Sequence, residues 1–235
     1  MKILTHQKNI RRNARIGQYT SLASLVILAG GMYISFIYPT MLYISFIALL
    51  VGFILSQVGI YFGNRWGRRP RVDERITTSL KGLTKDYTLY NFLTPVSHLL
   101  VGPAGVWIIE PFYQRGTIIY ENNKWKQRGG GLLLGYLKIF AQEGLGRPEL
   151  EVKADIDNLT DSFKKVLPEG QEIPTINAAL VFTDTRAEIK AEGAPIPAMK
   201  IEQLKEFLRK SAKENPLPAA EIKRICGMLP TESIE

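Results

Sequence analysis

The stretch that decides the fold is residues 16–64, IGQYTSLASLVILAGGMYISFIYPTMLYISFIALLVGFILSQVGIYFGN. It contains no Asp, Glu, Lys or Arg over its 49 residues. A transmembrane helix needs about 20 apolar residues to cross a hydrocarbon core of about 30 Å, so this run is long enough for two. Pro39 interrupts it near the middle, because proline cannot continue the hydrogen bonds of a helix. We therefore predict transmembrane helices at about 18–38 and 41–62, joined by a tight turn.

Basic residues flank this run on both sides. The N-terminal segment 1–17 carries five and the linker 63–71 carries four, whereas the turn between the helices carries none. Lys and Arg remain in the cytoplasm during insertion, so we predict a two-pass integral membrane protein with both termini cytoplasmic. A cleaved signal peptide is the alternative for the first span, but the second span follows it at once. The first partner expected is thus the lipid bilayer.

The net charge of +8 is a property of these flanks. Residues 1–72 hold nine of the 30 basic residues and none of the 22 acidic ones, which leaves residues 73–235 with 21 basic and 22 acidic residues, a net of −1. Phosphate contacts supply much of the affinity for nucleic acid, so a neutral domain gives nucleic-acid binding only weak support. The local basic cluster around Trp125 is interpreted as a solvated hairpin.

Histidine and cysteine are too few for a metal site of the usual kind. His6, His98 and Cys226 lie far apart in the sequence, and zinc needs three or four such ligands in one place. A single cysteine cannot form an internal disulfide, so Cys226 is predicted to be a core thiol in a C-terminal helix. We expect no cofactor from these residues.

Small residues recur in and after the second apolar span. Gly59, Gly63 and Gly67 are four residues apart, and Gly52 and Ser56 have the same spacing. Small side chains at this interval let two helices approach closely. Two outcomes stay open at this point. The hairpin packs against itself, or the chain binds a protein partner or a second copy of itself through Gly59 and Gly63.

The remainder, residues 72–235, alternates helical and strand-like patterns. Their order predicts an α/β domain around a mixed central sheet. The segment 129–146 is either a short surface helix lying near the bilayer or a lid on the domain core. The expected elements are a helix at 75–86, strands at 87–93, 97–101, 106–110 and 116–121, a hairpin to 124–126, a helix at 148–166, a strand at 178–182, and helices at 201–211 and 218–228.

Part of this domain resembles a known family. The stretch 98–110 (HLLVGPAGVWIIE) resembles the core of the nuclease-related domain (NERD) family, and Gly116, Trp125, Pro148 at a helix start and residues 181–183 (VFT) fit the same plan. The resemblance covers roughly residues 72–229. It implies a fold similar to the PD-(D/E)XK nucleases, which is a restriction-endonuclease-like α/β domain with a mixed sheet.

The resemblance also implies where a catalytic site would lie. In the family pattern an Asp opens one strand and Glu-x-Lys closes the next, so that a magnesium ion activates water and neutralises phosphate charge. The matching residues here are Ser97, Glu110 and Phe112. Ser97 cannot replace a carboxylate on a hard cation, and Phe112 carries no charge. We therefore expect no catalytic residue and no metal, with Glu110 and the helical Glu74 as vestiges of the site.

Three functions follow from this sequence. The first is a catalytically inactive pseudo-nuclease that acts as a binding or scaffolding module at the cytoplasmic membrane face. The second is a magnesium-dependent nuclease acting on DNA through a rearranged site built from Glu74, Glu110 and Lys153. The third is a structural subunit of a membrane complex, in which the helical hairpin matters most.

Overall fold

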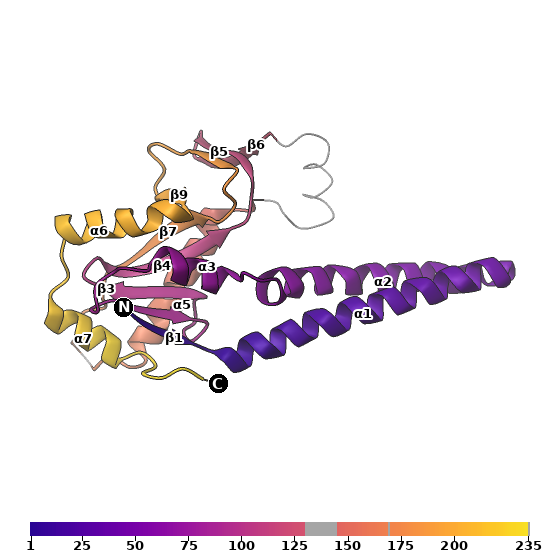
Figure 1. The fold of residues 1–235 in the computed structure, drawn as a ribbon, viewed down its shortest axis with the longest axis horizontal. Helices are drawn as coiled ribbons and strands as arrows, with labels where there is room; N and C mark the ends of the chain where they lie inside the picture. The colour runs from indigo at the N-terminus through magenta and orange to yellow at the C-terminus, as the bar shows by residue number, and fades with distance from the viewer. Residues whose placement is uncertain (130–144, 169, 235) are drawn as a thin grey trace. The chain divides into compact units, whose positions relative to one another are not determined.

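The chain forms two compact units (Figure 1). A computed structural model describes residues 1–129, 145–168 and 170–234. The helical unit holds residues 8–71, and the α/β unit holds residues 1–7 together with the described residues from 72 onward. The helical unit is therefore an insertion into the sequence of the α/β unit. Apart from its ends, the predicted surface helix or lid at 129–146 lies outside the described residues.

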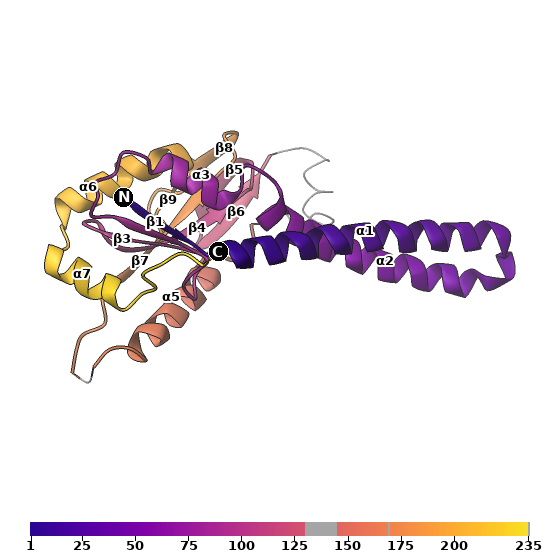
Figure 2. The ribbon, with the colours of Figure 1, turned by 60° about the horizontal axis from the view of Figure 1, so that its bottom comes forward.

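The helical unit is an antiparallel pair of long helices (Figure 1 and Figure 2). They are α1 (Gln7–Ile37) and α2 (Leu42–Phe62), with the short helical turn η1 (Pro39–Met41) between them and the π-helical turn η2 (Gly63–Gly67) at the end. Both are long and apolar enough to span a membrane, with mean hydropathies of 1.8 and 2.2 in their most apolar windows. The interruption at Pro39 is confirmed. Helix α1 begins well before the predicted residue 18, because the polar and basic residues there are compatible with a helix.

Small residues at intervals of seven line the contact between the two helices. The buried set in α1 includes Ile10, Gly17, Ser24 and Gly31, and the buried set in α2 is Ser45, Gly52 and Gly59. Seven residues are close to two helical turns, so such a repeat keeps one face on the partner helix in a left-handed pair. The small residues at this contact are seven residues apart, whereas the sequence suggested a spacing of four residues.

The glycines at this contact have no room for a side chain. A Cβ on Gly31 would lie 2.6 Å from the Cβ of Ala48, and one on Gly59 would lie 3.0 Å from the backbone nitrogen of Ser21. By contrast, a Cβ on Gly63 would meet nothing within 4 Å. Gly59 thus already contacts the other helix of the hairpin, while the α-carbon of Gly63 faces open space.

The α/β unit is built on a mixed sheet, as predicted. Its strand order is β1-β2-β3-β4-β7-β9, in which β3 is antiparallel to its two neighbours and the other pairs are parallel. A second sheet has the order β6-β5-β8. The strands are β1 (Lys2–Thr5), β2 (Thr88–Asn91), β3 (His98–Gly102), β4 (Gly105–Phe112), β5 (Gly116–Glu121), β6 (Lys124–Arg128), β7 (Ile176–Phe182), β8 (Ala187–Lys190) and β9 (Ala198–Lys200).

Helices cover both faces of the larger sheet (Figure 2). Helices α3 (Val72–Ser79) and α6 (Leu204–Glu214), the latter preceded by the turn η3 (Ile201–Gln203), pack on one face. Helices α5 (Pro148–Lys164) and α7 (Ala219–Gly227) pack on the other. Helix α3 ends earlier than predicted, because the chain turns at Gly82, whose φ of +88° suits glycine.

The N-terminal strand β1 corrects the predicted domain boundary. Residues 1–17 were expected to be a basic flank of the membrane helices, but β1 pairs in parallel with β2 from Lys2 to Thr5. The C-terminal tail covers the other edge of β1, where Ile234 N donates to Thr5 O at 3.2 Å and Thr5 N donates to Ser233 Oγ at 3.0 Å. A strand of four residues is too short for an alternating pattern to stand out, so β1 was not predicted from the sequence.

We predict that Gly59→Leu loosens the hairpin and that the matched variant Gly63→Leu does not. Leucine at residue 59 would overlap the backbone of Ser21, at a cost of about 1–3 kcal/mol, whereas residue 63 has space for it. Thermal loss of helical circular dichroism in detergent measures the difference. Equal melting temperatures for both variants would contradict the observed contact.

Candidate functional site

Three of the predicted site residues, Ser97, Glu110 and Phe112, lie at the edge of the larger sheet where the parallel strands end. Strands β1, β2, β4 and β7 all finish at this carboxyl edge, and β3 starts there, because it runs antiparallel to β2 and β4. Ligand sites in open α/β sheets form at such edges. Ser97 directly precedes β3, and Glu110 and Phe112 close β4. The carboxyl edge is therefore the candidate location of a functional site.

Ser97 and Glu110 are brought together. Strand β3 pairs with β4 so that Leu99 is opposite Ile108, and continuing this register by two residues places Ser97 opposite Glu110. Side chains alternate along a strand, so Ser97 and Glu110 belong to the face that carries Leu99 and Ile108. That face is the one covered by α5 and α7.

Phe112 is on the same face and is part of the hydrophobic core. Its side chain is only 6% exposed, and its ring stacks on Phe182 with centroids 5.5 Å apart and an interplanar angle of 27°. The two residues are also direct neighbours in the pairing of β4 with β7. Where the family resemblance implies a lysine, this chain has an aromatic ring packed against another.

Glu74 and Lys153 lie on helices that flank the sheet. Glu74 belongs to α3, which packs on the opposite face of the sheet from Glu110. Lys153 belongs to α5, but its side chain is exposed, while the adjacent Val152 faces the core. Within the described ranges, no three His, Cys, Asp or Glu side chains lie close enough together to hold a metal ion. The rearranged site would therefore have to reach around the edge of the sheet.

A row of buried polar side chains crosses three strands near the same edge. His98 Nδ1 and Asn91 Oδ1 are 2.9 Å apart, and Asn91 Nδ2 donates to Thr5 Oγ1 at 3.4 Å. All three residues are buried. Phe92 follows this row with a φ of +58°, which is unusual for a bulky residue, and its ring lies 4.9 Å from that of His98. The row stabilises the junction of β1, β2 and β3.

Cys226 lies in helix α7, as predicted, and is half-buried. It packs on the core cluster that contains Tyr90. Burial, followed by a hydrogen bond with Cys226, raises the pKa of the Tyr90 hydroxyl above its usual range. The surroundings of Cys226 are those of a structural thiol that contacts the buried phenol of Tyr90.

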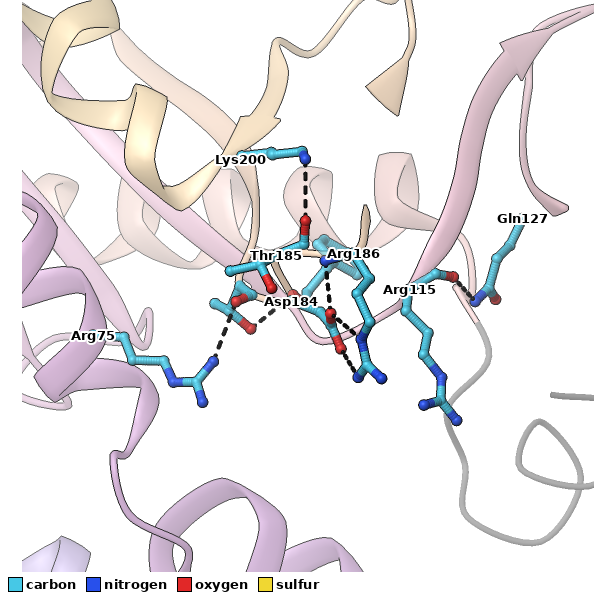
Figure 3. A network of polar contacts seen from close by, with 9 residues as sticks. Arg75, Arg115, Gln127, Asp184, Thr185, Arg186 and Lys200 are labelled. Carbon is cyan, nitrogen blue, oxygen red and sulfur yellow. Dashed lines mark hydrogen bonds and ion pairs between the residues drawn. The ribbon is translucent and has the colours of Figure 1, made fainter. Parts of the chain in front are cut away.

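Sequence reasoning missed a group of arginines at the carboxyl edge (Figure 3). Arg75 in α3 donates from Nη1 to Thr183 O at 3.2 Å. Arg186, after β7, donates from Nε to Asp184 Oδ1 at 2.9 Å and from Nη2 to Asp184 Oδ2 at 2.6 Å. Arg115, between β4 and β5, is close enough to act on Asp184 through its charge. Figure 3 shows the three guanidinium groups directed to the same side.

This setting stabilises the Asp184 carboxylate. Hydrogen bonds from the Arg186 side chain lower the pKa of Asp184 from 3.8 to about 2, and the Arg186 backbone N–H and the charges of Arg186 and Arg115 act in the same direction. Asp184 is therefore ionised at neutral pH and holds the loop after β7 in place. No single sequence motif contains these residues, because they come from a helix and two different loops.

A separate cavity of about 950 Å³ lies at the opposite end of the sheet, beside the turn between β3 and β4. Arg224 is among its lining residues, but its guanidinium group is engaged. Nε donates to Glu221 Oε2 at 2.8 Å, and Nη1 donates to Gln171 Oε1 at 3.1 Å. This arrangement stabilises the start of α7.

Comparison with known proteins adds no relative. No family model matches the chain, and no curated protein or solved structure matches it. The link to the nuclease-related family therefore rests on the residues of the sequence motif alone.

We predict that Asp184→Asn lowers the free energy of unfolding by about 1 kcal/mol at neutral pH, the upper end for an exposed ion pair. A carboxyl group whose pKa is depressed in the folded state stabilises the protein above its unfolded pKa and loses that effect as pH falls. The difference between wild type and variant should thus shrink between about pH 4 and pH 2. Urea unfolding in mild detergent, followed by tryptophan fluorescence, measures it. A difference that stays constant with pH would contradict the assignment.

Proposed function

We propose that this chain is a membrane-anchored, nuclease-related pseudo-enzyme. In this proposal residues 8–71 hold the protein in the bilayer by two crossings, and the α/β unit is a NERD-like domain of PD-(D/E)XK type on the cytoplasmic side. The domain binds or scaffolds a partner and does not cleave nucleic acid. The lipid bilayer and a protein are the partners expected.

The observation that carries the proposal is the packing of Phe112. A nuclease of this class needs a lysine near the scissile phosphate, and the equivalent position here is filled by a ring stacked on Phe182. A charged amine at a position only 6% exposed would require desolvation without a partner, which is strongly unfavourable. The packing around residue 112 is therefore unfavourable for the catalytic lysine.

The ligands for a metal are also too few. Ser97 faces Glu110 across the register, so one neutral hydroxyl stands where the family pattern has a carboxylate. Magnesium is held by carboxylates and phosphate oxygens together, and a single carboxylate leaves its charge poorly balanced. The rearranged nuclease, with Glu74 and Lys153, is less well supported because Glu74 belongs to the opposite face of the sheet.

The pairing of β1 with β2 supports a two-pass topology. Strand β1 precedes the helical unit and β2 follows it, yet the two are hydrogen-bonded neighbours in one sheet. Both flanks of the inserted hairpin must therefore lie on the same side of any membrane it crosses, which requires an even number of crossings. The basic flanks favour the cytoplasm as that side.

The third candidate, a structural subunit that associates through Gly59 and Gly63, is less well supported, because only Gly63 has an open α-carbon. Gly59 already contacts Ser21 of the same hairpin. The seven-residue repeat of small residues is satisfied by the packing of α1 on α2, so a partner would have to bind through another part of the hairpin.

We predict that the full chain in detergent does not cleave plasmid or single-stranded DNA in the presence of magnesium or manganese. Glu110→Ala should behave like the wild type, and so should Glu206→Ala, an exposed control on α6. Gel analysis of the DNA measures this. Cleavage that is lost in Glu110→Ala but retained in Glu206→Ala would overturn the pseudo-enzyme proposal.

We predict that a thiol-reactive, membrane-impermeant reagent labels the turn between the helices and not the termini. In a Cys226→Ser background, Thr40→Cys should react in intact cells, whereas Glu232→Cys should react only after the cells are broken. Quantitative labelling gives the result. Equal reactivity of both positions in intact cells would contradict the two-pass topology.

A further inference from the structure

The carboxyl edge of the larger sheet is where both connections to the helical unit leave the α/β unit. Strand β1 ends at this edge and leads directly to Gln7. Helix α3 starts there too, since its Arg75 reaches the carbonyl group of Thr183 just after β7. Eight residues lie between Gln7 and the charge-free run, and seven lie between the end of that run and Val72. Fully extended, either connection spans at most about 30 Å, so a membrane-spanning hairpin keeps this edge near the lipid headgroups.

The cationic side chains of this edge belong to separate elements that meet around residues 183–186. Arg186 is 67% exposed at its side chain, and Arg75 and Arg115 are half-buried. Asp184 interacts with Arg186 and Arg115, and its side chain is 19% exposed. Lys200 adds a fourth cation, with its Nζ on the carbonyl group of Thr185 at 3.1 Å. Four cations therefore gather around the Asp184 carboxylate in a domain that is neutral as a whole, and Glu110 of β4 and Glu74 of α3 are the nearby acidic residues on the adjoining elements.

An exposed aromatic side chain accompanies these arginines. Tyr113, two residues before Arg115, is 42% exposed. Tyrosine is favoured at the boundary between headgroups and hydrocarbon, because its ring is apolar and its hydroxyl is polar. Arginine binds phosphate oxygens with two parallel N–H donors. The loop between β4 and β5 thus presents both kinds of side chain that bind a lipid surface.

We propose that Arg75, Arg115 and Arg186, together with Tyr113, form a binding surface for the phosphate groups of anionic phospholipids. The inference rests on the proposed membrane anchoring. Lipid is favoured over nucleic acid for two reasons. The edge is tethered near the bilayer by two short connections, and the rest of the domain lacks the excess positive charge that an extended polyanion requires. The surface orients the α/β unit with its carboxyl edge toward the membrane.

The test is hydrogen–deuterium exchange of the full chain in lipid nanodiscs. Discs of phosphatidylcholine alone are compared with discs that also contain phosphatidylglycerol. Peptides covering residues 113–117 and 183–187 should exchange several-fold more slowly in the anionic discs. The slowing should disappear at about 1 M salt, where the Debye length falls to about 3 Å. Equal exchange in both discs would overturn the proposal.

Two variants and one control refine the result. Arg115→Gln with Arg186→Gln should abolish the slowing, and Arg115→Gln alone, which leaves the pair of Asp184 with Arg186 intact, should reduce it. Lys210→Gln with Lys213→Gln removes the same charge from α6 and should leave it unchanged. If the double arginine variant keeps the full slowing, the proposal is wrong. If a short DNA or RNA duplex slows the same peptides in neutral discs more than anionic lipid does, the surface binds nucleic acid and the lipid proposal is overturned.

Failure of the membrane anchoring gives a different result. A chain that does not stay with either kind of disc after a high-salt wash contradicts the anchoring and the lipid surface together. A chain that stays with both discs but shows no effect of phosphatidylglycerol contradicts only the lipid surface.

Discussion

The pairing of β1 with β2 is the constraint on which the architecture depends. It joins two parts of the α/β unit that are separated in sequence by the whole helical insertion. Closing such a long insertion costs less when its ends are already near each other. The hairpin provides this, because a Cβ on Gly17 near the start of α1 would lie 2.8 Å from the backbone nitrogen of Gly63 after α2. The close packing of α1 on α2 therefore keeps the two ends of the insertion near each other, as the pairing of β1 with β2 requires.

The small residues at seven-residue spacing have a role in this closure. They let the backbones of α1 and α2 approach along their whole length, and in lipid such packing replaces the hydrophobic effect as the force between helices. A hairpin that diverged at its open end would separate Gln7 from Val72 and strain the sheet. The sequence of the helical insertion is thus compatible with the strand pairing of the α/β unit.

The sequence predicted the features that depend on long or local patterns. The charge-free run and Pro39 predicted the two apolar helices, and the apolar stretches on both sides of the turn at 102–105 predicted the central strands of a mixed sheet. It did not predict β1, β8 or β9, which have three or four residues each and depend on neighbours far along the chain. The same limit applies to the site. Ser97, Glu110 and Phe112 share a motif, whereas Arg75, Arg115 and Arg186 meet only after folding.

The two sides of the carboxyl edge differ in chemistry. On the side of α5, Phe112 and Phe182 make the position that would hold a catalytic lysine apolar. On the side of α3, Arg75 and the loop after β7 present guanidinium groups. Metal-dependent cleavage needs carboxylates that hold a cation against phosphate, while guanidinium groups bind phosphate directly and leave its ester bonds intact. In the proposed pseudo-nuclease, the aromatic packing of Phe112 opposes cleavage of phosphodiesters, and the arginines on the other side are the groups proposed to bind phosphate.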